Sequence, residues 1–532
     1  STIRLWDTNA CTQIRCIRMD SPSRTITYSP DGKLVVVGFG SGGRRNRNKS
    51  TSKDGSFVVL GANDLKMIHE GKDSNEAIRF VKFSNDSKIL AIGSEDSKIY
   101  LYNVKDHFSR RCTINCHRAP VILADFSSDN SFLMSVDITK RICYSETTSG
   151  AHIPSPSALR DQKWATWSSP VGWPVKGLWS IQPPNSEPYS VQRSWGGMLL
   201  ACGNTDGRLF IVHNPCPDIG GFIGDNGHFG PISQVSWIAG DTSLITIGAK
   251  DHTILQWRLI YDNNRESGDE GGISCDDSEI ERDGGNDKLI KNLFYDDKVQ
   301  SLTGAQQQAW MSNVSPPTHV KDDINTLPPV TIEIDHIHGI RSSDCRNGIR
   351  YNDDGNIIFF SSRLGIIYDR QSHLQHIYDG HRNPIISLDI GVGRKIVATG
   401  EFAYNPEIHF WDARTAAKLS IISNIHRNGI ISMSFSPSGS TLATLGQDTL
   451  HSIVILKSCT TRWLDDIFIS SSINVSIPKM FWIHHSDESC EYPIITGGNR
   501  CLYYFKSVGK TLEKVKGTFG RKRKLQSILC SV

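Results

Sequence analysis

The stretch that decides the fold is residues 227–259, GHFGPISQVSWIAGDTSLITIGAKDHTILQWRL. Polar and apolar side chains alternate at residues 234–237 and 244–247, and residues 253–257 carry a third run. Alternation with a period of two, bounded by glycine and aspartate, is typical of strands with one buried face. The stretch therefore predicts three consecutive β-strands joined by turns.

The two ends of this stretch indicate what the strands build. Gly227 and His228 open it, and Trp257 lies near its end. A Gly-His start and a tryptophan near the finish, in a unit of roughly 40–45 residues, are typical of one β-propeller blade. The unit resembles a WD-repeat blade, which implies that His228, Thr246, Asp251 and Trp257 form a buried hydrogen-bonded tetrad. Three unrelated strands of a sandwich are the alternative, which the recurrence of the unit disfavours.

The same plan recurs along the chain. Residues 1–7, STIRLWD, resemble the last inner strand of a blade, and residues 78–104 repeat the strand pattern of the opening stretch. The unit that runs from Gly380 to Asp412 follows the pattern most closely. The blade residues predicted in these other units are Trp6, Asp7, Asp96, Tyr102, His381, Trp411, Asp412 and His426. Because the chain starts inside a blade and without methionine, we expect a fragment of a longer protein.

The distribution of blades predicts an all-β protein with two WD40-type propellers, one nearly complete and one partial. Residues 1–260 form the first, with about five to six blades, and residues 335–532 form the second, with about four. Residues 261–334 are acidic and rich in glycine and proline, a composition that does not bury a core. We expect them to form a disordered linker.

Composition excludes several classes of protein. The 532 residues carry a net charge of only +3, which gives no reason to expect nucleic acid or an anionic membrane as a partner. No apolar run approaches the ~18 residues that would cross a bilayer. The 13 cysteines are scattered and form no C-x-x-C pair, which is typical of a reducing compartment.

Three local patterns suggest binding sites, and each has a simpler interpretation. Cys112, Cys116 and His117 lack a second ligand pair at zinc-finger spacing, so we interpret them as ordinary blade residues. Residues 40–54 are rich in glycine and basic side chains but lack Gly-Lys-Ser/Thr, which favours a solvated loop over a phosphate site. The basic residues 521–524 fit an exposed turn better than a targeting signal.

The sequence contains no pattern typical of an active site. Its dense histidine groups, at residues 336–338, 373–376 and 484–485, have no companion ligands at metal spacing. No nucleophile-elbow or dinucleotide-binding motif is present. We therefore expect no enzyme activity, no cofactor and no metal, and we expect His228 and Asp251 to satisfy buried polar groups between strands.

Several irregular stretches resemble the echinoderm microtubule-associated protein-like family, whose members carry tandem atypical propellers and a short hydrophobic motif. SFVVL at 56–60, LAIGS at 90–94 and KWATW at 163–167 are similar to parts of that family's second propeller. DCRN at 344–347 and GIIYDRQ at 365–371 resemble its hydrophobic motif and the blade that follows. The order implies the end of one tandem unit, a linker and the start of another.

The resemblance implies a function as well as a fold. Members of the family bind tubulin or microtubules, so we expect a non-enzymatic cytoskeletal protein in the cytoplasm whose propeller surfaces contact tubulin. The alternative is a general WD-repeat interaction scaffold, for example the substrate receptor of a ubiquitin ligase complex. Its partners would be other proteins.

Overall fold

The computed structural model describes most of the chain. The described residues are 1–7, 12–40, 53–238, 240–261, 310–311, 314–319, 326–341, 345–449, 451–460, 462–464, 467–475, 480–486, 489–518 and 527–528. Within these ranges no helix is long and apolar enough to cross a bilayer. The central part of the expected linker, the basic residues 521–524 and most of the glycine-rich loop 40–54 lie outside the described residues.

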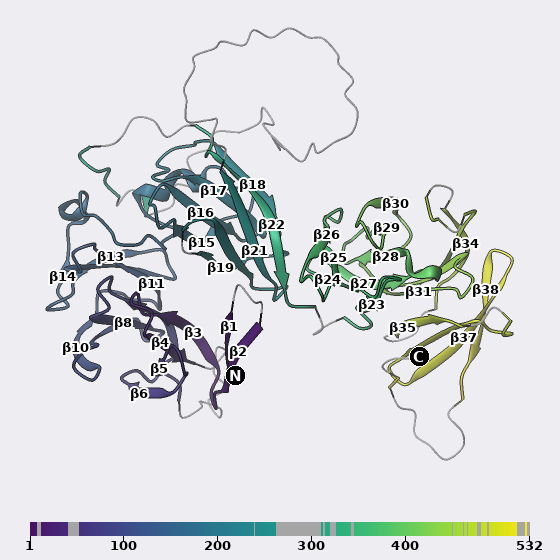
Figure 1. The fold of residues 1–532 in the computed structure, drawn as a ribbon, viewed down its shortest axis with the longest axis horizontal. Coiled ribbons are helices and arrows are strands. Elements are labelled where there is room, and N and C mark those ends of the chain that lie inside the picture. The colour runs from purple at the N-terminus through teal and green to yellow at the C-terminus, as the bar shows by residue number, and fades with distance from the viewer. Residues whose placement is uncertain are drawn as a thin grey trace, which may run out of the picture.

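A first group of sheets follows the chain from its start to His338. A two-stranded sheet of β1 (Thr2–Asp7) and β2 (Thr12–Arg18) comes first, and five four-stranded antiparallel sheets follow. Their strands are β3 (Ser23–Tyr28), β4 (Leu34–Phe39), β5 (Ser56–Gly61) and β6 (Met67–Lys72); β7 (Ile78–Phe83), β8 (Ile89–Ser94), β9 (Ile99–Asn103) and β10 (Ser109–Ile114); β11 (Val121–Phe126), β12 (Phe132–Asp137), β13 (Ile142–Glu146) and β14 (His152–Ile153); β15 (Pro188–Arg193), β16 (Leu199–Asn204), β17 (Arg208–His213) and β18 (Phe222–Asn226); and β19 (Ile232–Trp237), β20 (Ser243–Gly248), β21 (Ile254–Tyr261) and β22 (Val330–His338). Figure 1 shows these sheets arranged around a common centre.

A second group of sheets occupies the C-terminal part of the chain, on the right of Figure 1. Its strands are β23 (Ile349–Tyr351), β24 (Ile357–Ser361), β25 (Leu364–Tyr368) and β26 (Gln375–Tyr378); β27 (Ile385–Ile390), β28 (Ile396–Glu401), β29 (Ile408–Asp412) and β30 (Lys418–Ile422); β31 (Ile430–Phe435), β32 (Thr441–Gly446), β33 (Ile453–Ser458) and β34 (Ile467–Ile473); and β35 (Met480–His485), β36 (Ile494–Gly498), β37 (Cys501–Val508) and β38 (Thr511–Lys516). Each set of four is antiparallel, and one parallel pair, Ser472 with Thr511, joins the last two sets. The predicted all-β propeller class is confirmed.

A recurring serine fixes the turn between the first and second strands of several blades. Ser29, Ser84 and Ser127 each donate a hydroxyl hydrogen bond of 2.5–2.7 Å to an aspartate two residues later. The same oxygen accepts the backbone N–H five residues later at 2.9 Å. Because these serines are buried, each hydroxyl satisfies turn groups that water does not reach.

Some second strands of blades are buried on both faces. All six residues of β8 and of β16 are buried, whereas β20 alternates buried and half-buried residues as expected for a strand with one covered face. A four-stranded sheet with two apolar faces needs a neighbour on each side. Stacking of successive blades provides these neighbours.

The strand β22 crosses the domain boundary that the sequence predicted. Val330 opens this strand, which pairs with β21 over its whole length, so the boundary expected between residues 334 and 335 falls inside a strand of the first group. The physical reason is a period-two pattern in which Val330, Ile332 and Ile334 face a shared core. A bulge at Asp335 then brings Ile337 to the same core. Prolines at 328 and 329 and the long preceding insertion conceal this pattern in the sequence.

The two groups of sheets pack on each other through the blade that contains β22. Leu255 and Trp257 share a core with Leu364 and Ile366 of β25. At the same interface the hydroxyl of Thr253 lies 2.8 Å from that of Ser361. The sheets therefore continue from one group to the next by blade-on-blade contact.

Part of the expected linker is packed against the first group. Trp310 is only 5% exposed and contacts Val136, Val171 and Trp179. These partners lie in or near an irregular segment that contains the 3-10 helices η1 (Pro156–Leu159) and η2 (Trp173–Trp179). Thr318 adds two hydrogen bonds to the carboxylate of Asp161, at 2.7 and 2.6 Å. Composition alone suggested no core here, but one buried tryptophan anchors the segment.

Trp310→Ala should release this segment. Removing a buried aromatic side chain costs roughly 3–5 kcal/mol where the site does not collapse. We expect hydrogen exchange at residues 310–319 and at Val171 to accelerate, measured by mass spectrometry. Trp195→Ala is the matched control, because that tryptophan is 69% exposed. Equal exchange in both variants would contradict the anchoring role.

Candidate functional site: the buried histidine tetrads

The blade that ends the first group contains a complete hydrogen-bonded tetrad. His228 Nδ1 lies 3.1 Å from the carboxylate of Asp251, and Nε2 lies 2.7 Å from the hydroxyl of Thr246. Trp257 Nε1 donates to the same hydroxyl at 2.9 Å. An ionised carboxylate only accepts hydrogen bonds, so the N–H at Nδ1 donates to Asp251. The structure thus brings together the four residues that the sequence singled out.

The buried charge in this tetrad is stabilised by its donors. Burial by itself raises the pKa of Asp251, but the hydrogen bond and charge interaction with His228, followed by the backbone N–H groups of Phe229 and Thr253, hold that pKa below its usual value. The carboxylate therefore stays ionised between the sheets. A buried ionised group is tolerated when its acceptor sites are filled in this way.

The blade of β27–β30 contains a second tetrad with a glutamate as its acid. His381 Nδ1 lies 3.0 Å from Glu401 and Nε2 lies 2.7 Å from the hydroxyl of Thr399. Trp411 Nε1 donates to that hydroxyl at 3.0 Å. Asp412 is outside the tetrad: its carboxylate accepts the backbone N–H groups of Arg414 and Thr415 and closes the turn after β29. The sequence indicated His381 and Trp411 but not Glu401.

A second histidine extends this tetrad. The ring of His409 stacks on that of His381 with 3.7 Å between centroids, and its Nδ1 lies 2.7 Å from the hydroxyl of Tyr378. Burial and the neighbouring His381 lower the pKa of His409 to about 4. Burial raises the pKa of Glu401, but His381 and Asn383 outweigh it and lower the value to about 2. Burial also lowers the pKa of His381, so at neutral pH both rings are neutral beside a carboxylate.

The next blade replaces direct contact between histidine and acid with a relay. His426 Nδ1 lies 2.7 Å from the hydroxyl of Ser452, which donates to Asp448. Nε2 lies 2.8 Å from the hydroxyl of Thr444. Burial lowers the pKa of His426 to about 4.

A fourth histidine network, of three side chains, was missed by the sequence interpretation. His117 Nδ1 lies 3.1 Å from Asp137, and Nε2 lies 2.8 Å from Ser135. In all four blades the hydroxyl residue follows the histidine by 18 positions. A search for Ser or Thr at that interval after each histidine would have found His117, and a search for an acid a few residues farther on would have found Glu401.

The blade of β7–β10 places its predicted residues differently. Asp96 accepts hydrogen bonds from Ser74 at 3.0 Å and Tyr100 at 2.6 Å. Tyr102 donates instead to Asp73 at 2.6 Å. Asp96 and Tyr102 therefore belong to two adjacent hydrogen-bonded sets. The second-strand hydroxyl, Ser94, contacts Ser74 at 2.8 Å in place of a histidine.

Trp6 and Asp7 end the strand β1, but Trp6 does not fill a buried tetrad position. Its side chain is 52% exposed, whereas Trp257 and Trp411 are fully buried. The difference follows from the sheet, because among the described strands β1 pairs with β2 alone.

Charged side chains bind successive blades together. Asp125 of β11 pairs with Lys82 of the preceding blade at 3.2 Å and accepts the backbone N–H of Ser168 at 2.8 Å. Asp389 of β27 repeats the arrangement with Arg350 at 2.9 Å and the backbone N–H of Phe435 at 2.8 Å. Each aspartate thus joins the blade before it to the segment or blade after it.

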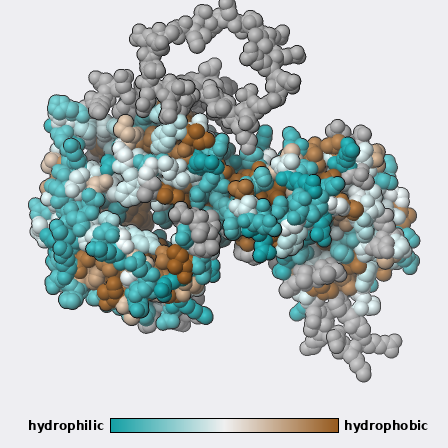
Figure 2. Space-filling view, viewed as in Figure 1, coloured by the Kyte–Doolittle hydropathy of each residue, from teal (hydrophilic) through white to brown (hydrophobic). Residues whose placement is uncertain are grey.

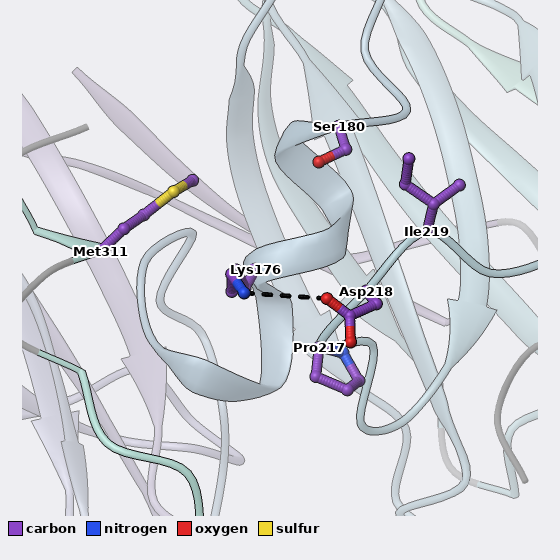
Figure 3. A pocket seen from close by; sticks show the side chains of 6 residues that line it. All are labelled: Lys176, Ser180, Pro217, Asp218, Ile219 and Met311. Carbon is purple, nitrogen blue, oxygen red and sulfur yellow. Dashed lines mark ion pairs between the residues drawn. The ribbon is translucent and has the colours of Figure 1, made fainter. Parts of the chain in front are cut away.

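A cavity of about 420 Å³ lies beside η2 and the packed linker segment. Figure 3 shows Lys176 and Asp218 facing each other in its lining, at 3.7 Å, with Ile219 and Met311 at the sides. The pair is exposed, and the only other polar side chain in this lining is Ser180, which has no histidine or second carboxylate beside it among the lining residues. The arrangement suits a surface contact better than a reaction.

Comparison with known proteins connects this architecture to a family. The pattern described as "Echinoderm microtubule-associated protein second beta-propeller" matches residues 1–259, and the pattern described as "HELP motif" matches residues 327–366. These two matches support membership in the echinoderm microtubule-associated protein-like family. The HELP match contains the whole of β22 and extends into β25, so this family motif spans the contact between the two groups of sheets.

The sequence identity between this chain and individual relatives is low. Human "Echinoderm microtubule-associated protein-like 2" is 28% identical over 264 residues, which are 48% of this chain and 38% of the relative. "Echinoderm microtubule-associated protein-like 4" of Xenopus tropicalis is 28% identical over 247 residues, which are 46% of this chain and 25% of the relative. The chain thus spans well under half the length of these relatives. The β-propeller domain of Cps50 (Swd1) from Myceliophteria thermophila aligns at a TM-score of 0.33 and 12% identity over 81% of this chain and 95% of that domain, too low to carry an argument.

Trp411→Ala should destabilise the protein by roughly 3–5 kcal/mol, because the side chain is fully buried and its N–H holds Thr399. Trp6→Ala is the matched control. The sequence assigned both tryptophans the same role, but the half-exposed Trp6 should cost no more than about 0.5 kcal/mol. Urea unfolding followed by circular dichroism would measure both. A similar loss in the free energy of unfolding for both variants would refute the difference in burial.

Acidification should destabilise the protein through its buried histidines. The pKa values of His409 and His426 are about 4 in the folded state, against an ordinary value near 6.5. The unfolded chain therefore binds more protons in that interval, so stability is complete above about pH 6.5 and falls as the pH approaches 4. His409→Gln should flatten this dependence even where it lowers stability at pH 7. The exposed His376→Gln serves as control, and an unchanged slope in His409→Gln would contradict the assignment.

Proposed function

We propose that this chain is a non-enzymatic WD-repeat module that binds tubulin or microtubules and works at the cytoskeleton, in the cytoplasm. The observation that supports this is the order of family segments, with a second-propeller match at residues 1–259 and a HELP match at 327–366. Relatives that match the first segment are named microtubule-associated proteins. Because the chain spans only part of their length, its binding partner is inferred from the family.

The chemistry of the blades supports a binding role. The rings of His117, His228, His381 and His426 each have both nitrogens in hydrogen bonds, and these four residues are buried. Their acids are held by the same networks. A general base must reach a substrate proton, which buried and saturated rings do not allow.

Exposed turns offer the contacts that the tetrads do not. Figure 2 shows a largely hydrophilic surface broken by separate apolar patches. Trp195 and Met198, in the turn between β15 and β16, are 69% and 68% exposed. Tyr404, in the turn between β28 and β29, is 70% exposed. Aromatic side chains on rigid turns are suited to anchoring a protein partner. With a net charge of +3, we propose neither nucleic acid nor membrane as a partner.

Co-sedimentation with taxol-stabilised microtubules at low salt tests the proposal. We expect the chain to pellet with the polymer and saturate with polymer concentration, and gel filtration with free tubulin would show whether the unpolymerised dimer also binds. Centrifugation of the chain without microtubules controls for aggregation. Failure to associate in both assays, with the protein folded by circular dichroism, would remove the proposal.

Matched variants would locate the contact. Trp195→Ala with Met198→Ala probes a turn between first and second strands, and Tyr404→Ala probes a turn between second and third strands. Successive turns of an antiparallel sheet lie at opposite ends of a strand, so the two variants test opposite ends of the blades. Affinity reduced by one variant alone would identify the end that binds. A pull-down dominated by ligase adaptors, without tubulin, would instead support the scaffold alternative.

A further inference from the structure

Two cysteines and a histidine lie close together in the blade of β11–β14. They are separate from the hydrogen-bonded set of His117, Ser135 and Asp137 in the same blade. Cys116 precedes β11, Cys143 lies on β13 and His152 lies on β14. Each side chain offers one donor atom, and the three atoms lie within 4.8 Å of one another. Pairing of β13 with β14 sets His152 opposite Ser145, so the histidine faces the strand that carries Cys143.

The surroundings of these side chains suit metal ligands. Cys143 is buried, Cys116 is half-buried and His152 is exposed, which makes the cluster accessible from the surface. His152 Nδ1 lies 3.1 Å from the carbonyl oxygen of Tyr144. A carbonyl only accepts, so Nδ1 carries the proton and Nε2 keeps its lone pair. Histidines that bind metals usually donate their other ring N–H to such an acceptor, which fixes the ring orientation.

We propose that Cys116, Cys143 and His152 bind a zinc ion. Zinc takes thiolate and imidazole ligands at about 2.3 and 2.0–2.1 Å, which sets donor atoms about 3.5–3.8 Å apart around a tetrahedral ion. The present cluster requires shifts of only about an ångström to reach that spacing. Two thiolates balance the charge of Zn²⁺, their two protons pass to solvent on binding, and the fourth position is open to water.

The neighbouring cysteine and histidine have other roles. The ring of His117 is held by Asp137 and Ser135. Cys112 is directed to the carbonyl oxygen of Thr147, at 3.8 Å from its sulfur, and is not part of the cluster. The sequence pattern that suggested a site, Cys112 with Cys116 and His117, therefore contains only one of the proposed ligands. The other two come from the hairpin that follows.

Titration of the whole, metal-free and reduced chain with Co²⁺ tests the site. Cobalt replaces zinc and shows an intense near-ultraviolet thiolate charge-transfer band and the visible absorption of tetrahedral coordination. We expect both bands to saturate at one equivalent and to disappear when Zn²⁺ displaces the cobalt. Mg²⁺ should not displace it, because magnesium prefers oxygen ligands.

Variants separate the proposed ligands from the other thiols. Cys116→Ser and Cys143→Ser should abolish the charge-transfer band, and His152→Ala should weaken Zn²⁺ binding at least tenfold. Cys112→Ser is the matched control and should leave titration unchanged.

Because His152 is exposed, its loss leaves the fold intact, so the result is interpretable even if a buried cysteine variant unfolds. Absence of the thiolate band, or a band unaffected by His152→Ala and Cys116→Ser, would overturn the proposal, as would a disulfide between Cys116 and Cys143 in the reduced preparation. None of these readouts depends on tubulin binding.

Discussion

The structure depends on satisfying polar groups between sheets whose faces are otherwise apolar. In four blades a hydroxyl on the second strand lies within 2.7–2.8 Å of a histidine 18 residues earlier. Where a tryptophan is present, as at Trp257 and Trp411, its N–H donates to the same hydroxyl. One oxygen thus links the entry of a blade to its third strand. Without it, a buried ring nitrogen and an indole N–H would lose partners that water cannot replace.

A second constraint orders the blades relative to one another. Asp125 and Asp389 occupy corresponding first-strand positions and are both deeply buried, yet the shifts of their pKa values are opposite. Burial raises the pKa of both, but Lys82, Thr166 and Ser168 together lower that of Asp125. Asp389 has fewer donors, Arg350 and the backbone N–H of Phe435 among them, and its pKa stays raised. The number of donors that the neighbouring blades contribute therefore decides how firmly each charge is held.

The sequence predicted the features that repeat and failed where a blade departs from the repeat. Period-two alternation predicted strands such as β20, and His228 with Trp257 predicted the tetrad type. The sequence did not predict Glu401, because the acid of a blade was expected to be an aspartate. Glutamate reaches the same ring nitrogen. Trp6 has the residue type but lacks the strands that would bury it. Trp310 lies in a segment whose composition argues against a core. A single side chain that packs against Val136 and Val171 leaves no periodic signal in the sequence.

The same physics limits where function can lie. His381, Glu401 and His426 are buried inside the blades with their polar atoms in hydrogen bonds, and their lowered pKa values keep each in one protonation state at neutral pH. Under the proposed binding role, recognition falls to the turns, whose backbones the blades hold in place while placing few demands on side-chain identity. Trp195 illustrates this: its backbone N–H is fixed by Asp241 at 2.8 Å, yet most of its ring stays exposed. A turn fixed by its backbone can change its side chains without loss of the fold. Blades built on one plan can therefore bind different partners. For this reason the family match is more informative about the partner than the tetrads are.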